Sequence, residues 1–373
     1  MDSPAAALPV GGPLRNDNPM KLGVFAMNCK GGTALTRYPR GRIVPTWEQQ
    51  VSLARTADEA GWEFLLPLGR WRGLGGDTDP VAAQFEVFTW AAGITASTSR
   101  IHVLATVHTA LFEPLVAAKQ AATIDHIGGG RFGLNIVAGW NQPEMAMFGK
   151  QIPDHHARYA QADEWTTLVR RLWSETEEFD FAGDTYSAQG AYLSPRPVNQ
   201  PVIVQAGLSP DGMAFAAKHA DYGFQSHPDI GRLAEMGKDL RRRAEQHGRE
   251  PGVLVTAYVV CADTEAEARR FHDHYVDELG DFAAARNLVD QLIGGGSRSW
   301  PAETYRAMVR GMVASWGAYP LVGTPEMIVE KLVELHSIGV GGVGLSWVDY
   351  QSGIRQFDEK VVPLMVDAGL RRP

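Results

Sequence analysis

The chain has 373 residues, of which 45% are hydrophobic and 21% are charged, and this composition is ordinary for a globular protein. Its formal net charge is -8 with the two signs interspersed, so it lacks the basic face by which nucleic-acid-binding proteins attract phosphate. No apolar run is long enough to cross a membrane. We therefore expect neither a nucleic-acid partner nor a membrane partner.

The first 19 residues are rich in proline and glycine, which predicts a disordered N-terminal tail. They lack the basic segment and the apolar core of a signal peptide. The two cysteines, Cys29 and Cys261, lie far apart and form no C-x-x-C pair, which is typical of buried thiols in a reducing compartment. We expect a cytoplasmic protein in which residues 20–373 form a single domain.

Short apolar runs alternate with helix-like segments along the rest of the chain, which favours β/α units and a parallel sheet. Several of these runs are apolar on both faces, as parallel strands covered by helices should be. The eight predicted strands are Lys21–Met27, Glu63–Leu66, Ile101–Thr106, Phe132–Val137, Val202–Ala206, Tyr222–Gln225, Val253–Val260 and Gly342–Trp347. Eight such strands separated by helices predict an α/β fold, the (β/α)8 or TIM barrel.

Recognisable capping signals separate the strands from the predicted helices. Thr46 with Gln49 forms a capping box, and Gly61 follows that helix. Ser209 and Thr324 each precede a proline, the usual sequence of an N-cap followed by the first helical residue.

Two regions exceed a minimal barrel. The insertion after strand 4, residues 140–201, contains a predicted helix at 159–173 and a predicted hairpin at 178–187. The insertion between strands 7 and 8, residues 280–321, contains the run Gly294-Gly295-Gly296-Ser297. Long loops within a compact domain are usually functional. The glycine run favours a hinged lid over the barrel mouth, and a surface or subunit-contact insertion is the alternative.

Asn135 is the most informative single residue, because it lies in an otherwise apolar strand that follows the glycine run 128–130. A buried amide needs a hydrogen-bond partner, and a bound ligand is one candidate. Active sites of TIM barrels lie at the C-terminal ends of the strands. We therefore expect a ligand site near Asn135.

Motifs for other chemistries are absent from the sequence, including the G-x-S-x-G elbow, the phosphate-binding P-loop and the H-E-x-x-H zinc helix. His155 and His156 are adjacent and would not share one helix face, so we expect no metal site. The strand ends instead carry aromatic, amide and guanidinium groups, which suit a planar heteroaromatic ligand. Ser209 at a helix N-terminus, with Arg158 and Tyr159, suits a phosphate, although Ser209 is also explained as a simple N-cap.

The chain resembles the bacterial luciferase-like flavin monooxygenases, and within them the pyrimidine monooxygenase branch. The motifs that carry this resemblance are ATIDHIGGGRFGLNIVAGW at 122–140, the Arg-Tyr pair at 158–159, QAGLSPDGMAFAAKHAD at 205–221, LVGTPEMIVEKL at 321–332, RGLGG at 72–76, TSRIHVLAT at 98–106 and SGIRQFDEKVVPLM at 352–365.

The resemblance implies a TIM barrel that binds reduced FMN supplied by a separate NAD(P)H:flavin reductase, with O₂ as co-substrate. It implies catalytic roles for Thr106 and Asn135, where oxygen would meet flavin N5. It places the cofactor contacts at Gly69, Arg70, Thr106, Asn135, Glu144, Arg158, Tyr159, Ala206, Gly207 and Ser209. Candidate substrate walls, for which core packing is the alternative, are Met27, Trp71, His108, Trp140 and Trp347.

The chain departs from the pyrimidine pattern at Pro67–Trp71, at Val107-His108 and at Leu208, all near the expected substrate pocket. We therefore expect a substrate other than uracil, such as another heterocyclic amide oxygenated through a flavin N5-oxygen species. The alternatives are sulfone or sulfonate oxygenation with C–S cleavage, deazaflavin-dependent hydride transfer, and flavin binding without turnover. The resemblance also implies a homodimer or homotetramer.

Overall fold

The computed structural model describes residues 13–292 and 301–372. Eight parallel strands close into a barrel, because β1 pairs with both β2 and β11 and the chain of pairings runs without a break between them. The barrel strands, in order around the ring, are β1 (Lys21–Phe25), β2 (Phe64–Leu66), β3 (His102–His108), β4 (Phe132–Val137), β7 (Val202–Gln205), β8 (Tyr222–Gln225), β9 (Gly252–Cys261) and β11 (Gly342–Ser346). The predicted barrel is confirmed.

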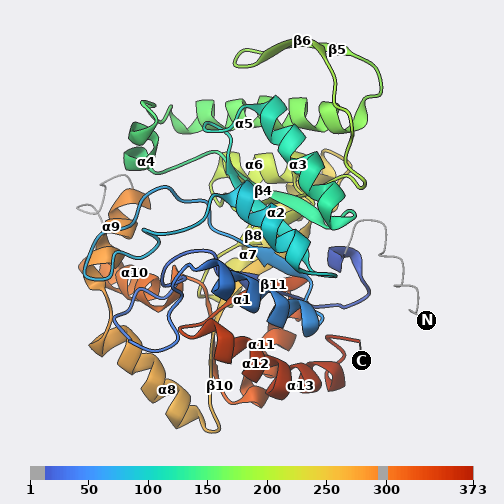
Figure 1. Ribbon diagram of the computed structural model, residues 1–373. Helices are drawn as coiled ribbons and strands as arrows, with labels where there is room; N and C mark the ends of the chain where they lie inside the picture. The colour runs from blue at the N-terminus through green and yellow to red at the C-terminus, as the bar shows by residue number, and fades with distance from the viewer. Residues whose placement is uncertain (1–12, 293–300, 373) are drawn as a thin grey trace.

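Helices surround the barrel (Figure 1). Their bounds are α1 (Trp47–Glu59), α2 (Val87–Ser97), α3 (Pro114–Gly128), α4 (Gln142–Met147), α5 (His155–Ser174), α6 (Pro210–His219), α7 (Ile230–Glu245), α8 (Glu265–Asp273), α9 (Phe282–Leu292), α10 (Ala302–Ser315), α11 (Pro325–Ser337), α12 (Tyr350–Lys360) and α13 (Val362–Asp367). The predicted N-caps form as expected, since Thr46, Ser209 and Thr324 each accept a hydrogen bond from the backbone three residues later.

The insertion after β4 holds α4, α5 and an antiparallel pair, β5 (Phe179–Ala182) and β6 (Ser187–Ala191). This hairpin lies beyond α5, at the top of Figure 1. The predicted helix and hairpin are therefore both present, with β6 extending further than the sequence indicated.

The insertion between β9 and β11 is more regular than a lid loop. It contains α8, α9 and α10, and then β10 (Tyr319–Gly323), a ninth parallel strand that pairs with the second half of β9 from Tyr319↔Ala257 to Gly323↔Cys261. β10 was not predicted from the sequence, because its apolar run is short and contains Pro320. The glycine run 294–297, proposed as a hinge, lies outside the described residues.

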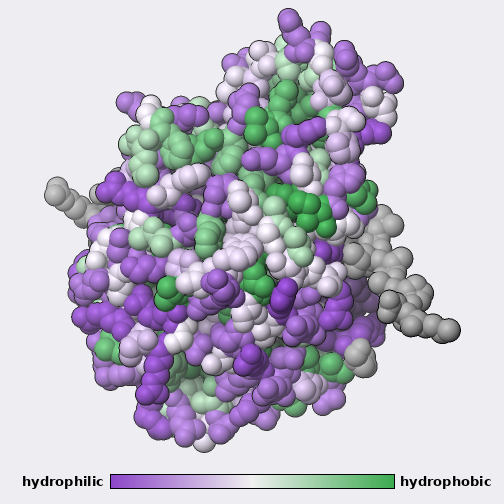
Figure 2. Space-filling view, in the orientation of Figure 1, coloured by the Kyte–Doolittle hydropathy of each residue, from purple (hydrophilic) through white to green (hydrophobic). Residues whose placement is uncertain are grey.

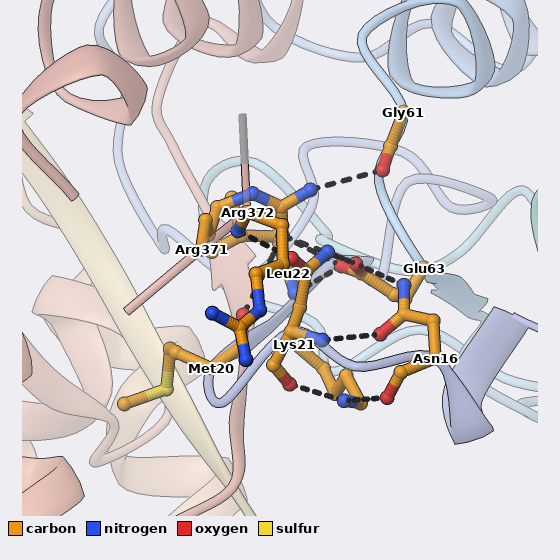
Figure 3. A network of polar contacts seen from close by, with 9 residues as sticks. Asn16, Met20, Lys21, Leu22, Gly61, Glu63, Arg371 and Arg372 are labelled. Carbon is orange, nitrogen blue, oxygen red and sulfur yellow. Dashed lines mark hydrogen bonds and ion pairs between the residues drawn. The ribbon is translucent and has the colours of Figure 1, made fainter. Parts of the chain in front are cut away.

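Near both ends of the described chain, Asn16 and Arg371 meet around Glu63 at the N-terminal end of the barrel (Figure 3). Glu63 is fully buried there, where its carboxylate accepts a hydrogen bond from Asn16 Nδ2 at 2.8 Å and pairs with Arg371 Nη1 at 2.8 Å. Leu14 is also fully buried, and its carbonyl accepts a hydrogen bond from the Tyr222 hydroxyl. Leu14 and Asn16, which belong to the predicted tail, thus contact the barrel, while residues 1–12 of that tail lie outside the described residues.

Two negative findings apply to residues 13–292 and 301–372. None of the helices there combines the length and apolar character that crossing a bilayer requires. Likewise, no three histidine, cysteine, aspartate or glutamate side chains converge in a way that could hold a metal ion.

Candidate functional site

A cavity of about 600 Å³ opens at the C-terminal ends of the barrel strands. Side chains from β1, β2, β3, β4, β7, β8 and β9, or from the loops that follow them, form its walls together with α10. Seven of the predicted site residues line this cavity: Gly69, Arg70, Thr106, His108, Asn135, Trp140 and Ala206. A smaller pocket of about 340 Å³ lies beside it and shares Gly69, Arg70, Thr106 and His108 as its wall.

Thr106 and Asn135 meet because they are directly opposite one another in the parallel register of β3 and β4. Asn135 Nδ2 donates a hydrogen bond to Thr106 Oγ1 at 3.1 Å, and Thr106 Oγ1 donates in turn to the carbonyl of Pro67. Both side chains are almost fully buried, and Asn135 Oδ1 has no hydrogen-bond partner among the described residues. An acceptor is therefore left for a group that enters the cavity.

Arg70 and Glu144 form a buried ion pair at the same end of the barrel. Arg70 Nε lies 2.9 Å from Glu144 Oε1, and the same oxygen accepts hydrogen bonds from the backbone nitrogens of Trp71 and Arg72. The Arg70 guanidinium lies over the Trp140 ring, 4.6 Å from its centroid. Its Nη1 and Nη2 atoms are buried without a hydrogen-bond partner in the described part of the chain.

Glu144 was expected to contact the cofactor, but it lines neither cavity. It instead fixes the loop after β2 and supplies the counter-charge of Arg70. Its position follows from the N-cap of α4, where Asn141 Oδ1 accepts a hydrogen bond from the Glu144 backbone nitrogen at 3.0 Å.

His108 lies at the junction of the two cavities and is 3% exposed. Burial, and to a smaller extent the positive charge of Arg70, together lower the pKa of His108 to about 4. At neutral pH the imidazole is therefore uncharged and can serve as a hydrogen-bond donor and acceptor.

A compact cradle follows β7, next to the cavity-lining residues Ala206 and Leu208. Ser209 caps α6, and a Cβ atom at Gly207 would collide with Tyr159 Oη and Gln205 Nε2. Burial raises the pKa of Tyr159, so its hydroxyl remains a hydrogen-bond donor at neutral pH. Gln205 Oε1 is buried without a partner among the described residues.

Arg158 lies between this cradle and the loop after β4. Its Nη1 atom donates a hydrogen bond to the carbonyl of Gly139, just before Trp140. Its Nε atom is buried and makes no hydrogen bond to any described residue. Tyr159 thus lies beside Gly207 and Ser209, whereas Arg158 is bonded to the loop after β4.

Two of the expected substrate walls do not line either cavity. Trp347 lies between the barrel and its helices, with its ring centroid 5.9 Å from that of Trp62 and 6.3 Å from that of Phe357. Met27 belongs to the same outer core and is fully buried. Side chains alternate along a strand, so Ser346, which bonds to Ser315 Oγ, faces inward and Trp347 faces the helices. Trp71 lines the smaller pocket and is 38% exposed.

α10 and β8 also contribute cavity walls, which were not predicted from the sequence. Phe224, Ser226 and Thr256 line the far side of the cavity, where Ser226 and Thr256 are hydrogen-bonded to each other at 2.8 Å. The cavity face of α10 consists of Thr304, Ala307, Met308, Gly311, Met312 and Ser315. These residues recur every three or four positions, and this spacing in the sequence indicates that they share one face of a helix.

Comparisons with known proteins identify the family of this chain. A family model described as luciferase-like monooxygenase matches residues 20–342. Pyrimidine monooxygenases named RutA from Acinetobacter baylyi and Escherichia coli are each 33% identical over 93% of the chain, and the matches cover 95% and 91% of those proteins.

Solved structures share the same fold. Riboflavin lyase RcaE, determined with modified FMN and its substrate riboflavin, superposes with a TM-score of 0.84 at 22% identity, covering 94% of this chain and 92% of its own. Long-chain alkane monooxygenase LadA gives a TM-score of 0.84 at 21% identity, with coverages of 96% and 93%.

Proposed function

This chain belongs to the luciferase-like monooxygenase family of flavin-dependent enzymes, and on that premise we propose that it is an FMN-dependent, two-component monooxygenase. A separate NAD(P)H:flavin reductase would deliver the reduced FMN, and O₂ would be the co-substrate. The organic substrate would be a small heterocyclic amide.

The unpaired polar groups of the barrel mouth fit FMN. Arg70 Nη1 and Nη2 and Asn135 Oδ1 lack partners among the described residues, and both residues line a cavity with aromatic and aliphatic walls. At its edge, Gly207 leaves room that a Cβ would fill, next to the N-terminus of α6 and the Tyr159 hydroxyl. Donors and a helix N-terminus at that place suit a phosphate, and the cavity suits a planar ring system.

Each group then has a defined task. Ser209, Gly207, Tyr159, Arg158 and Ala206 would hold the phosphate end, and Gly69 and Arg70 would hold the ring. Bound reduced FMN would supply the electrons that activate oxygen. The Thr106 hydroxyl and the Asn135 amide would lie where oxygen meets the ring. Because both groups are already fixed, they would not need to reorient during the reaction.

The single observation that carries this proposal is the buried Thr106–Asn135 pair, which leaves Asn135 Oδ1 unpaired within the described residues at the cavity wall. Trp140 and the uncharged His108 would contact the substrate, with Trp71 at the entrance of the smaller pocket.

Reconstitution tests the proposal. Purified protein is supplied with FMN, a flavin reductase, NADH and ¹⁸O₂, and a panel of nitrogen heterocycles and sulfones is screened for products by mass spectrometry. We expect one ¹⁸O atom in the product of a heterocyclic amide. Product from a sulfone or sulfonate with release of sulfite would replace the amide assignment. Binding of a deazaflavin in place of FMN, or FMN binding without any product, would refute a monooxygenase.

We also propose that residues 20–373 act as one domain in the cytoplasm and that the chain forms a homodimer or homotetramer. Hydrophobic groups gather near α3 and below the β5–β6 hairpin in Figure 2. Val116 on α3 is 53% exposed and Tyr192 after β6 is 64% exposed. Large exposed apolar patches usually mark association surfaces. Light scattering after size exclusion decides between monomer, dimer and tetramer.

A further inference from the structure

One wall of the barrel-mouth cavity is an apolar helix face that the flavin assignment does not use. The α10 side chains Ala307, Met308 and Met312 line the cavity, and Gly311 lies between them. Phe25 and Phe224 lie on the barrel side of the same cavity and contact each other edge to face, with ring centroids 5.2 Å apart. The opposite side of α10 is anchored, because Val309 and Val313 are buried in the inner core cluster.

Polar groups that lack partners within the described residues are concentrated on the other side of the cavity. Arg70 and Asn135, on the β2 and β4 side, carry such atoms. On the α10 side, two hydroxyls are already paired: Ser315 Oγ with Thr33 Oγ1 at 2.7 Å and Ser226 Oγ with Thr256 Oγ1 at 2.8 Å. Trp316 Nε1, just after α10, is a buried donor without a partner among the described residues. That side therefore offers a ligand a mainly apolar surface.

Space also remains above α10. A Cβ atom built on Gly311 meets no heavy atom of the described residues within 4 Å, although this glycine lines the cavity and has ordinary helical backbone angles. Glycine weakens a helix interior, so its presence here costs helix stability and leaves the cavity open.

We propose that the substrate carries an apolar ring or chain that packs against the α10 face, next to the polar group that reacts at the flavin. The substrate class is thus a fused or aryl- or alkyl-substituted heterocyclic amide, larger and more apolar than a bare pyrimidine. This inference rests on the proposed function, since the polar side of the cavity is assigned to FMN.

The test compares two ligands that share one cyclic amide. 2-Pyridone has a single ring, and 2-quinolone adds a fused benzene ring. Their dissociation constants for the FMN-loaded protein are measured from the change in flavin absorbance. We expect 2-quinolone to bind at least about tenfold tighter, because its added apolar carbons leave water.

Variants at Gly311 then locate the apolar ring. Gly311→Leu fills the open space, so the affinity for 2-quinolone should fall by about tenfold or more, while the affinities for 2-pyridone and FMN change less than about threefold. Gly311→Ala is the matched control, since it adds only a methyl group and should retain most of the preference. Both variants should melt at or above the wild-type temperature, because each removes a glycine from a helix.

Each failure is distinct. If the wild-type protein binds no FMN, the proposed function fails, and this inference fails with it. If FMN binds but the two ligands bind equally, only the inference is overturned. If Gly311→Leu weakens FMN as much as 2-quinolone, the α10 face packs against the flavin and the inference is likewise overturned.

Discussion

Asn135 and Thr106 form a buried hydrogen-bonded pair across two neighbouring parallel strands, with Asn135 Nδ2 donating to Thr106 Oγ1 at 3.1 Å. Thr106 is held from its other side by the Pro67 carbonyl. The pair is therefore fixed before any ligand binds, and the orientation of the Asn135 amide directs its Oδ1 atom away from Thr106. Preorganised polar groups of this kind are effective in catalysis because they need not reorient.

Asn135→Ala and Thr106→Ala should each reduce product formation by roughly 10²-fold, as the loss of one preorganised dipole does in other enzymes. FMN affinity should weaken less, because other contacts hold the cofactor. The measurement is the rate of product formation in the reconstituted system beside an FMN titration. Thr106→Ser keeps the hydroxyl and should retain most activity. Near-native rates in both alanine variants would show that the oxygen site lies elsewhere.

Glu144→Gln should lower the unfolding free energy by about 3 kcal/mol, because it leaves the buried Arg70 guanidinium without its counter-charge. Urea unfolding followed by circular dichroism measures this loss. Glu175→Gln, which removes an exposed partner of Arg171, is the matched control and should leave stability almost unchanged. Equal stability of Glu144→Gln and the wild type would mean that the Arg70–Glu144 pair does not hold the loop after β2.

Gly207→Ala should weaken FMN binding by roughly tenfold or more, since the added methyl group displaces Tyr159 or Gln205 from the proposed phosphate cradle. Riboflavin lacks the phosphate, so its affinity should be nearly the same in the variant and the wild type. Flavin fluorescence quenching measures both ligands. A parallel loss of riboflavin affinity would place the disturbance at the ring instead of the phosphate.

Stability should fall in mild acid through His108. Burial lowers the pKa of His108 from 6.5 to about 4 in the folded chain, so the unfolded chain takes up the proton first. The free energy of unfolding is therefore unaffected by His108 above about pH 6.5 and falls progressively as the pH is lowered toward 4, because the unfolded chain is protonated there and the folded chain is not. His108→Gln should therefore show a shallower decline, by up to about 1.4 kcal/mol per pH unit.

Urea unfolding of the flavin-free protein at several pH values between 7 and 5 measures these slopes. His102 provides an internal comparison, because burial lowers its pKa to about 3 at the opposite end of β3. An identical pH dependence in His108→Gln and the wild type would mean that His108 titrates normally and is not buried as described.

Glu63→Gln should lower the stability of the chain by about 3 kcal/mol and leave FMN affinity within about twofold of the wild type. Glu63 is fully buried at the N-terminal end of the barrel, where it joins Asn16 to Arg371. Thermal melting and an FMN titration on the folded variant measure the two effects. A large loss of FMN affinity in folded protein would show that the two ends of the barrel are coupled.

The sequence predicted the barrel well because each strand is an apolar run between capped helices. Asn135 was found because a buried amide in such a run requires a partner, and the structure places it in contact with Thr106. The direction of Trp347 could not be predicted, since it depends on which face of β11 turns inward, and the sequence alone does not specify that register. The pairing of Arg70 with Glu144 was equally hidden, because it joins the loop after β2 to α4, and the two residues are 74 positions apart.

The contribution of α10 was missed for a different reason. Its apolar residues at 307, 308, 311 and 312 show a helical period, but an apolar helix face ordinarily indicates packing against the core. Only the three-dimensional arrangement shows that this face borders a cavity, while Val309 and Val313 on the same helix are the residues that pack inward.

The most direct test of this account is an FMN titration of the purified wild-type chain, performed with oxidised flavin in air and with reduced flavin under argon. We expect at least one redox state to bind with a dissociation constant near or below about 1 µM, which corresponds to about -8 kcal/mol, and to raise the melting temperature. If neither oxidised nor reduced FMN binds or changes the melting temperature, the barrel-mouth cavity is not a flavin site and the account is contradicted.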